Sequence, residues 1–241
     1  MEDERKVIGT AATICYENRF AWIGMVLVDP EYRKQGIGTQ LLQKAIEYLD
    51  HLPIPTIKLD ATPLGRPLYT KLGFVDEYGI ERWVLKRPPE TIPAIPPSTC
   101  EPLTEGQKEQ IFTLDRQLFG ADRRFLLHSL SEEAPELVRT VWREQTPECF
   151  AFGRHGLFAD HLGPWMATSR GAAERLLPEF LAGSVRETLV VDCIKSNLRT
   201  AESLAAAGFE LSRPLTRMVR GPNAYPGTPG SFCAILGPEF G

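Results

Sequence analysis

Two patterns of hydrophobic residues follow one another near the start of the chain. Val7 to Tyr16 and Arg19 to Val28 are rich in apolar and β-branched residues, and the Glu17-Asn18 turn separates them, so they predict two neighbouring strands. The second strand is apolar on both faces, which is typical of a strand inside a covered sheet. From Gly38 onward, apolar residues recur at a spacing of three and four, which predicts an amphipathic helix. Its apolar stripe comprises Leu41, Leu42, Ala45, Ile46 and Leu49.

The next forty residues continue this alternation of strands and helices. Thr56 to Ala61 predicts a strand, and Gly65 to Leu72 predicts a short helix that Gly73 ends. Phe74 to Leu85 reads as one bent strand or two short ones. Because a strand, helix, strand order normally makes a right-handed crossover, we expect an α/β fold built on a mixed sheet.

A proline-rich stretch then interrupts the pattern. Lys86 to Pro102 contains six prolines, which oppose both helix and sheet hydrogen bonding. We therefore predict a first domain at 1–87, a linker at 88–102 and a second domain at 103–241. In the second domain we expect helices near Thr104–Leu118, Arg123–Leu130, Pro135–Glu144 and Ala172–Leu181. We expect strands near Cys149–Phe152, Gly156–Phe158 and Pro164–Ala167.

The sequence near the end of the chain resembles the sequence at the end of its first third. Each copy has an aspartate at the end of a strand, a Gly-Phe pair, and an arginine nine residues past the glycine. The matched positions are Asp60 and Asp192, Gly73-Phe74 and Gly208-Phe209, and Arg82 and Arg217. Two copies of one α/β unit would explain this likeness. The identities are sparse, so a chance likeness remains the alternative.

Composition narrows the class of ligand. The net charge is −4, from 27 basic and 31 acidic residues, which gives no electrostatic reason to expect nucleic acid or an anionic membrane as a partner. The five cysteines lack CxxC spacing and the four histidines lack metal-ligand spacing, so we expect no metal. The charged N-terminus predicts neither a signal peptide nor a membrane span. A cytoplasmic protein with a small soluble ligand fits best.

The segment between the second strand and the helix predicts an anion site. Arg33-Lys34-Gln35-Gly36-Ile37-Gly38 leads directly into the helix, whose first amides lack internal partners and carry the positive end of the dipole. Glycine at positions 36 and 38 opens those amides to a phosphate, and the two cations add charge. The alternative is a solvated turn whose glycines only shape the bend.

Two motifs together resemble one known family. The dinucleotide fingerprint and the P-loop do not fit this loop. Arg33 to Gly38 does match the R/Q-x-x-G-x-G/A pattern, and LYTKLGF at Leu68 to Phe74 is similar to a second signature, of the GNAT superfamily of N-acetyltransferases. The whole chain resembles a bacterial two-part subgroup whose C-terminal domain is a degenerate GNAT-like copy. The resemblance implies two tandem acetyltransferase-like units.

The resemblance also implies a ligand and its contacts. In the family, acetyl-CoA lays its pyrophosphate on the loop amides, and its pantetheine arm pairs like an added strand with the preceding strand. Carried over, the cofactor-binding residues are Val26, Leu27, Val28, Arg33, Lys34, Gln35, Gly36, Ile37, Gly38 and Thr39.

Acetyl transfer also needs a proton for the leaving thiolate, and this defines the catalytic candidates. The resemblance assigns that role to Tyr69, and the alternative is that its ring only packs on the sheet. Thr62 stands where the family often has a cofactor-contacting asparagine. Asp60 is a candidate general base, although a structural carboxylate that caps a turn is the favoured interpretation.

The second copy departs from the family's pattern. It keeps an asparagine at Asn197, has Leu204 in place of the tyrosine and lacks the loop motif, so we expect it to have lost ordinary coenzyme A binding. Family members also have a strand and two helices before the region of Val7. Their absence predicts exposed apolar sheet surface and self-association, for example as a homodimer.

These observations predict an enzyme that moves an acetyl group from acetyl-CoA to an amine of a small molecule or peptide. A non-catalytic sensor of coenzyme A or an acyl ligand is the alternative, and a third interpretation is an interaction protein with a vestigial loop.

Overall fold

The computed structural model describes residues 1–3, 6–92 and 103–241. The chain forms two compact units. Unit 1 comprises Met1–Glu77, Thr216–Tyr225 and Pro238–Gly241, and unit 2 comprises Tyr78–Leu215 and Pro226–Gly237. Each unit therefore combines segments that lie far apart in the sequence.

Unit 1 is built on a mixed sheet. Its strands, in spatial order, are β3 (Gly9–Tyr16), β4 (Phe20–Val28), β5 (Ile57–Ala61) and the last part of β11 (Glu210–Arg220). β3 pairs antiparallel with β4, β4 pairs parallel with β5, and β11 pairs antiparallel with β5. A short separate hairpin is formed by β1 (Glu2–Asp3) and β2 (Lys6–Val7).

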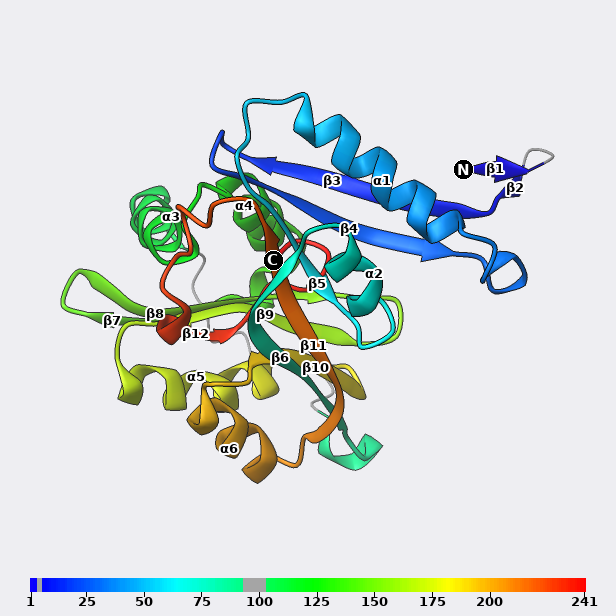
Figure 1. The fold of residues 1–241 in the computed structure, drawn as a ribbon. Helices are drawn as coiled ribbons and strands as arrows, with labels where there is room; N and C mark the ends of the chain where they lie inside the picture. The colour runs from blue at the N-terminus through cyan, green and yellow to red at the C-terminus, as the bar shows by residue number, and fades with distance from the viewer. Residues whose placement is uncertain (4–5, 93–102) are drawn as a thin grey trace. The chain divides into compact units, whose positions relative to one another are not determined.

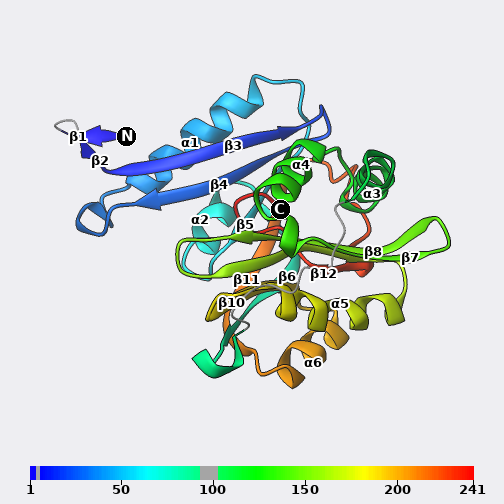
Figure 2. The ribbon, with the colours of Figure 1, turned by 180° about the vertical axis from the view of Figure 1, so that it is seen from behind.

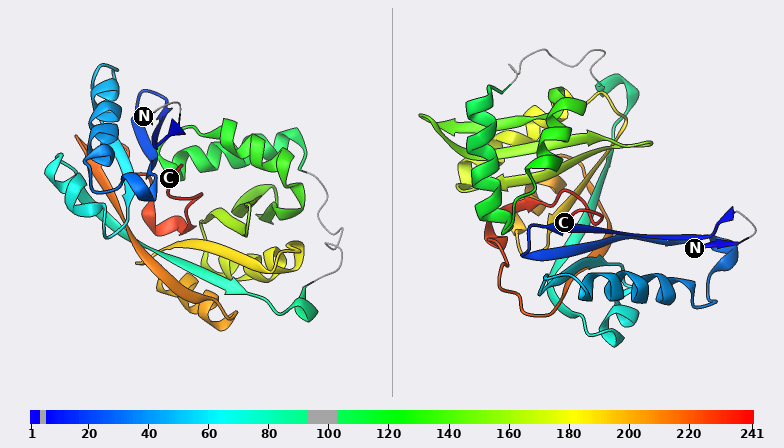
Figure 3. Two further views of the ribbon diagram at one scale, coloured as in Figure 1. Left: turned by 90° about the vertical axis from the view of Figure 1, so that its right-hand side faces the viewer. Right: turned by 90° about the horizontal axis from the view of Figure 1, so that it is seen from above.

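Helices α1 (Ile37–Asp50) and α2 (Arg66–Lys71) cover one face of this sheet. Figure 1 and the right-hand view of Figure 3 show α1 lying along strands β3 and β4. The apolar stripe of α1 packs on alternate residues of the strands, because successive strand side chains point to opposite faces. The core cluster of this face comprises Ala21, Ile23, Leu42, Ala45, Leu49, Ile57, Leu59, Ala61, Phe74 and Met218.

The opposite face of the unit 1 sheet carries Phe20 and Trp22, which are 1% and 0% exposed. The sequence predicts exposed apolar surface on the sheet of this unit. Around Trp22, however, the segment Pro238–Gly241 covers the sheet. The Trp22 Nε1 donates to the Pro238 carbonyl at 2.9 Å, and the Tyr16 hydroxyl donates to the Phe240 carbonyl at 2.6 Å. A segment from the far end of the sequence thus completes this face near β4.

Unit 2 is also built on a mixed arrangement of strands. In spatial order its strands are β6 (Val75–Lys86), β10 (Thr188–Ile194), β12 (Phe232–Ala234), β9 (Asp160–Ala167), β8 (Thr146–His155) and β7 (Arg139–Arg143). Helices α3 (Glu105–Phe119) and α4 (Arg124–Glu133) lie on one side, and α5 (Arg170–Gly183) and α6 (Leu198–Ala206) lie on the other (Figure 2). The described residues also form four short 3₁₀ turns: η1 (Pro30–Tyr32), η2 (Pro89–Thr91), η3 (Pro135–Leu137) and η4 (Pro229–Ser231).

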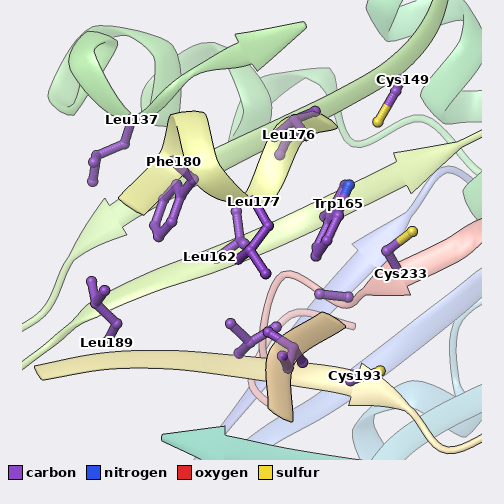
Figure 4. Packing of buried hydrophobic residues seen from close by; sticks show 14 of the residues in the cluster. Leu137, Cys149, Leu162, Trp165, Leu176, Leu177, Phe180, Leu189, Cys193 and Cys233 are labelled. Carbon is purple, nitrogen blue, oxygen red and sulfur yellow. The ribbon is translucent and has the colours of Figure 1, made fainter. Parts of the chain in front are cut away.

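The main core of unit 2 lies between its sheet and helices α5 and α6. Figure 4 shows Leu176, Leu177 and Phe180 of α5 packed over Leu162 and Trp165 of β9. All five side chains are at most 3% exposed. This packing explains why the α5 segment is helical although the side chain of its N-cap residue, Ser169, forms no capping hydrogen bond.

The last strand of each sequence copy pairs within the other unit. β6, from the first copy, pairs antiparallel with β10 and places Arg82 opposite Asp192. β11, from the second copy, pairs antiparallel with β5 and places Arg217 opposite Asp60. Both pairs are bidentate, with N–O distances of 2.7–2.8 Å in the first and 2.9 Å in the second. The two copies therefore exchange strands, and this explains why aspartate and arginine recur together in the sequence.

Further hydrogen bonds support the repeat. The Phe74 amide donates to the Tyr69 carbonyl at 3.1 Å, and the Phe209 amide donates to the Leu204 carbonyl at 3.0 Å. Gly73 and Gly208, which precede the two phenylalanines, have φ of +86° and +88°. Each copy thus ends its short helix with the same left-handed glycine, as the sequence indicates.

The sequence prediction for the second half is wrong at two places. The helix expected at Pro135–Glu144 is the short turn η3 followed by strand β7. The β-branched and aromatic residues of β7 pair with β8, and this strand pairing outweighs the helical pattern that the sequence of the segment indicated. The strand expected at Gly156–Phe158 is the connection between β8 and β9, and Leu157 and Phe158 are more than 80% exposed there.

The predicted linker at 88–102 is described only as far as residue 92, and the remainder lies outside the described residues. The described part contains η2. The division of the chain into domains at residues 87 and 103 remains a prediction from the sequence.

Candidate functional site

The loop between β4 and α1 has an unusual backbone. Lys34 and Gly36 have φ of +63° and +81°, so both adopt the left-handed conformation. The Asp29 carboxylate accepts a hydrogen bond from the Glu31 amide at 3.0 Å, and the Arg33 Nε donates to the Val28 carbonyl at 3.1 Å. These contacts fix the part of the loop between Val28 and Arg33, and glycine at position 36 removes the strain that a side chain would cause there.

The amides of this loop are available to a ligand. The first backbone hydrogen bond of α1 runs from the Gln40 amide to the Gly36 carbonyl at 3.0 Å. Among the described residues, the amides from 34 to 39 donate to no backbone carbonyl. An added Cβ at Gly36 would meet no atom within 4 Å, and at Gly38 only a Val28 methyl at 3.6 Å. The surface over these amides is open, and the helix dipole makes it attractive to an anion.

The charges around the loop favour an anion as well. Arg33 and Lys34 are exposed. The nearby Asp29 and Glu31 carboxylates lie 3.0 and 3.5 Å from the Lys6 ammonium, which offsets their charge. The hydrogen bond from the Glu31 amide, followed by that from Lys6, lowers the pKa of Asp29, so this carboxylate stays ionised and holds the turn.

The end of β4 bulges away from regular pairing. The register of β3 and β4 shifts between Thr10 and Ala12, and Met25 has φ of +52°. The Thr10 hydroxyl donates to the Met25 carbonyl at 2.9 Å and so fixes the bulge. Beta-bulges re-aim backbone groups and occur next to active sites.

β4 and β5 separate before β4 ends. Their parallel pairing comprises Ala21 with Ile57 and Trp22 with Lys58, and no pairing beyond Trp22 is formed among the described residues. Beyond this point the β4 edge that faced β5 is open, and Met25 and Leu27 are 50% and 55% exposed. The strand predicted to be apolar on both faces is therefore covered at its start and accessible at its end, where an extended ligand can pair with its backbone.

Tyr69 of α2 packs against the core cluster on the helix-covered face of unit 1. Its ring rests on Gly65, where an added Cβ would lie 3.0 Å from the ring, and it packs edge-on to Phe74 with ring centroids 6.2 Å apart. Its hydroxyl forms no hydrogen bond with the described residues, and burial raises the pKa of the phenol. Tyr69 is thus a protonated donor at neutral pH, held in a fixed orientation.

The other two candidates of the first copy have structural partners. The Thr62 hydroxyl accepts a hydrogen bond from the Gly65 amide at 3.2 Å, which supports the turn before α2. The Asp60 carboxylate is fully buried in its bidentate pair with Arg217, whose guanidinium stacks 4.5 Å from the Trp22 ring centroid. Asp60 lies within β5, so its structural role is an ion pair across strands and not the capping of a turn.

The corresponding opening in unit 2 is filled by the chain itself. β9 and β10 pair in parallel through three residue pairs, the last of which is Leu162 with Val191. Beyond that, β12 inserts between them, with Ala234 opposite both Trp165 and Cys193. A cavity of about 260 Å³ remains beside β12, lined in part by Ser169, Asn197 and Cys233. Leu204, at the position of Tyr69, is fully buried.

Sequence reasoning missed β12 and the Met25 bulge. β12 is only three residues long, and its neighbours are proline, glycine and serine, so no periodicity marks it. A methionine with positive φ carries no sequence signal either, because glycine or asparagine is the usual residue there. The Gly24-Met25 dipeptide in an apolar strand was the one available hint of an irregularity.

Comparisons with family models identify the family of the chain. Residues 1–76 match one model of the acetyltransferase (GNAT) domain, and residues 111–231 match a second GNAT-domain model. The chain belongs to the GNAT superfamily of acetyltransferases. The tandem arrangement and the mixed α/β fold expected from the sequence are confirmed.

Individual relatives cover much of this GNAT chain. YitH of Bacillus subtilis, an N-acetyltransferase whose activity is uncharacterised, is 27% identical over 199 residues, which are 79% of this chain and 66% of YitH. The match thus spans slightly less than two thirds of that relative. A crystal structure from Pyrococcus horikoshii, provisionally assigned as an acetyltransferase, has a TM-score of 0.77 and 26% identity, and covers 99% of this chain and 78% of its own.

A tandem GNAT protein from the clavulanic acid biosynthesis pathway is also similar in fold. It has a TM-score of 0.58 and 14% identity, with 92% of this chain and 82% of its own covered. Within the described part of this GNAT chain, no helix has the length and apolarity that crossing a membrane requires. Those residues also hold no cluster of three or more His, Cys, Asp or Glu side chains suited to a metal ion.

Proposed function

We propose that the protein transfers an acetyl group from acetyl-CoA to an amine, and that unit 1 holds the donor. The observation that carries this proposal is the contrast between the two openings. In unit 1 the strands separate beyond Trp22 and leave the end of β4 open, next to a loop of available amides. In unit 2 the chain fills the equivalent space with β12.

Each residue of the donor site has a physical role in this proposal. The amides of Gln35 to Thr39 and the cations of Arg33 and Lys34 would bind the pyrophosphate, because both present positive charge to solvent. The backbone of Val26 to Val28 would pair with the pantetheine amides, as an added strand does. Bound in this way, acetyl-CoA would place its thioester where β4 and β5 separate, within reach of Tyr69.

The acceptor then approaches from the opposite face. Helices α1 and α2 cover the face on which Tyr69 lies, so an amine reaches the opening from the face that carries Trp22. The fixed Tyr69 hydroxyl supports protonation of the leaving thiolate, since its raised pKa keeps the proton in place until the transition state requires it.

Replacing Tyr69 with phenylalanine tests that role. Tyr69→Phe keeps the ring that rests on Gly65 and packs on Phe74, and removes only the hydroxyl. We expect kcat to fall by about 100-fold, the lower range for a positioned proton donor, with an unchanged Kd for acetyl-CoA. Steady-state kinetics and calorimetry measure the two quantities. An unchanged kcat would assign Tyr69 to packing alone.

Calorimetric stoichiometry tests the contrast between the units. We expect one acetyl-CoA per chain, because β12 blocks the second site. A stoichiometry of two in the intact chain would show that the unit 2 opening still binds the donor.

The experiment that tests the function is a turnover assay with purified chain, acetyl-CoA and a panel of amines, alongside the binding titration. Binding with turnover supports the enzyme. Binding without turnover on any amine favours the sensor, and the absence of binding overturns the donor site in unit 1.

A further inference from the structure

One edge of the unit 1 sheet is open. β3 is the last strand of that sheet, and among the described residues β4 is the only strand that pairs with it (Figure 2). Met1 covers the beginning of this edge, since its ammonium donates to the Gly9 carbonyl at 2.9 Å and its carbonyl accepts from the Ile8 amide at 3.0 Å. From Thr10 to Cys15, the backbone groups that point away from β4 have no backbone partner within the described part of the chain.

This edge lacks the features that normally protect one. Charged residues, prolines or short length protect the edge strands of natural sheets, because an open edge can pair with another strand. The edge strand of unit 2, β7, has only five residues and an arginine at each end. β3 has eight residues, GTAATICY, with neither a charge nor a proline. We therefore expect the free edge of β3 to be paired with a further strand.

The surface beside the edge is largely apolar. An open groove of about 460 Å³ lies between β3 and α1, and it is lined in part by Val7, Ala11, Leu41 and Tyr48. Val7 and Tyr48 are 56% and 58% exposed, so two large side chains contact solvent here. Tyrosine is enriched in the interfaces between proteins. An added strand along β3 would bring its own side chains onto this groove.

A second copy of the chain suits this edge. Two identical strands that pair antiparallel are related by a two-fold axis, so the middle residues of each strand face themselves or their neighbours in the other copy. A charge in the middle would oppose its own copy, and β3 has none. Its middle residues are Ala12 and Thr13, and opposed threonines form a favourable cross-strand pair. The charged residues that line the groove, Glu2 and Lys44, have opposite signs, so the grooves of two copies do not repel each other.

We propose that two copies of the chain pair antiparallel through β3 and extend the sheet of unit 1 across a two-fold axis. Thr10 to Cys15 form the shared edge, and Tyr48 lies beside it in each copy. The sequence predicts self-association, and this inference gives it a surface. It goes beyond the proposed function, because the pairing does not depend on acetyl-CoA or on turnover.

Charged variants of Ala12 test the interface. Ala12 is exposed, so a charged side chain fits in the single chain, whereas in the pair it would lie near the same charge of the second copy. In sedimentation velocity of the purified full chain, we expect a dimer at micromolar concentrations. Ala12→Glu and Ala12→Lys should each raise its dissociation constant by about tenfold or more, since the axis repeats the unfavourable contact. An equimolar mixture of the two variants should dimerise again, because opposite charges then lie near each other.

Gln43→Glu and Gln43→Lys are the matched controls. They introduce the same charges at an exposed residue of α1 that does not line the groove, and they should leave the dissociation constant within about twofold. A chain that stays monomeric at micromolar concentrations overturns the proposal, and so does a dimer that both Ala12 variants retain. Failure of the mixture to dimerise would also contradict it, because the loss would then reflect a disturbed strand.

Amide hydrogen exchange locates the contact directly. Every second amide between Thr10 and Cys15 points away from β4, and its exchange should slow by about tenfold when the chain concentration is raised well above the dissociation constant. The amides of β7, the edge strand of unit 2, should keep their rates. A dimer in which the exchange of the β3 amides does not depend on concentration uses another surface, and this result would refute the pairing through β3.

Discussion

Gly36→Asp should weaken acetyl-CoA binding at least 100-fold, which corresponds to about 2.7 kcal/mol. The new carboxylate would stand over the amides that open between Lys34 and α1, where it competes with and repels a pyrophosphate. An added Cβ at this position meets no atom within 4 Å, so the aspartate has space, and the strain that the φ of +81° imposes on its backbone is shared by the control variant below. Isothermal titration calorimetry measures the loss directly.

Gly36→Asn is the matched control. Asparagine has nearly the same shape as aspartate and likewise tolerates the φ of +81° at this position, but it carries no charge. We expect it to reduce affinity by less than about tenfold. Similar losses for both variants would mean that backbone conformation, and not charge, determines binding at the loop. Full affinity in Gly36→Asp would place the pyrophosphate elsewhere.

Asp60→Asn should lower the free energy of unfolding by about 3–5 kcal/mol. The substitution leaves the Arg217 guanidinium, whose side chain is 3% exposed, without its ionised partner in the interior of unit 1. Breaking one side of a buried pair costs more than the pair contributes, since the remaining charge stays desolvated. Denaturant unfolding of the full chain, followed by circular dichroism, measures the change.

Asp50→Asn provides the control for this variant. Asp50 also forms a bidentate pair with an arginine of β11, Arg220, but the two side chains are 46% and 33% exposed. We expect a loss of only about 0–1 kcal/mol because solvent screens this pair. If Asp60→Asn keeps the stability and lowers kcat by 100-fold or more, the carboxylate is a general base and the structural interpretation is wrong.

The first half of the chain could be predicted well because its signals are local. Periodicity located β4 and α1, and the glycine motif located the loop between them. The pairing of Arg217 with Asp60 was out of reach, although both residues had been noticed, because the sequence does not say which copy supplies the partner strand. Strand pairing over a separation of 157 residues leaves no local pattern.

The candidate site was predictable only where its signals are local in the sequence. Sequence reasoning selected Tyr69 and the loop, and their contributions to acetyl transfer remain proposals. It did not indicate the Met25 bulge, the filling of unit 2 by β12 or the covering of Trp22 by Pro238–Gly241. Each of these depends on backbone geometry or on packing between distant segments. The helix wrongly expected at Pro135–Glu144 shows the same limit, since pairing with β8 decides its conformation.

The exchanged strands also set the order of events during synthesis. Thr216 follows Glu77 by 139 positions in the chain, so the sheet of unit 1 stays incomplete while the ribosome makes almost all of unit 2. Thr216 pairs with Ala61, the last residue of β5, and follows it by 155 positions, so at typical elongation rates of about 5–20 residues per second the nascent β5 edge waits roughly 8–31 seconds for β11. During that interval the buried position of Asp60 is open, and chaperones have access to an edge that the finished protein conceals.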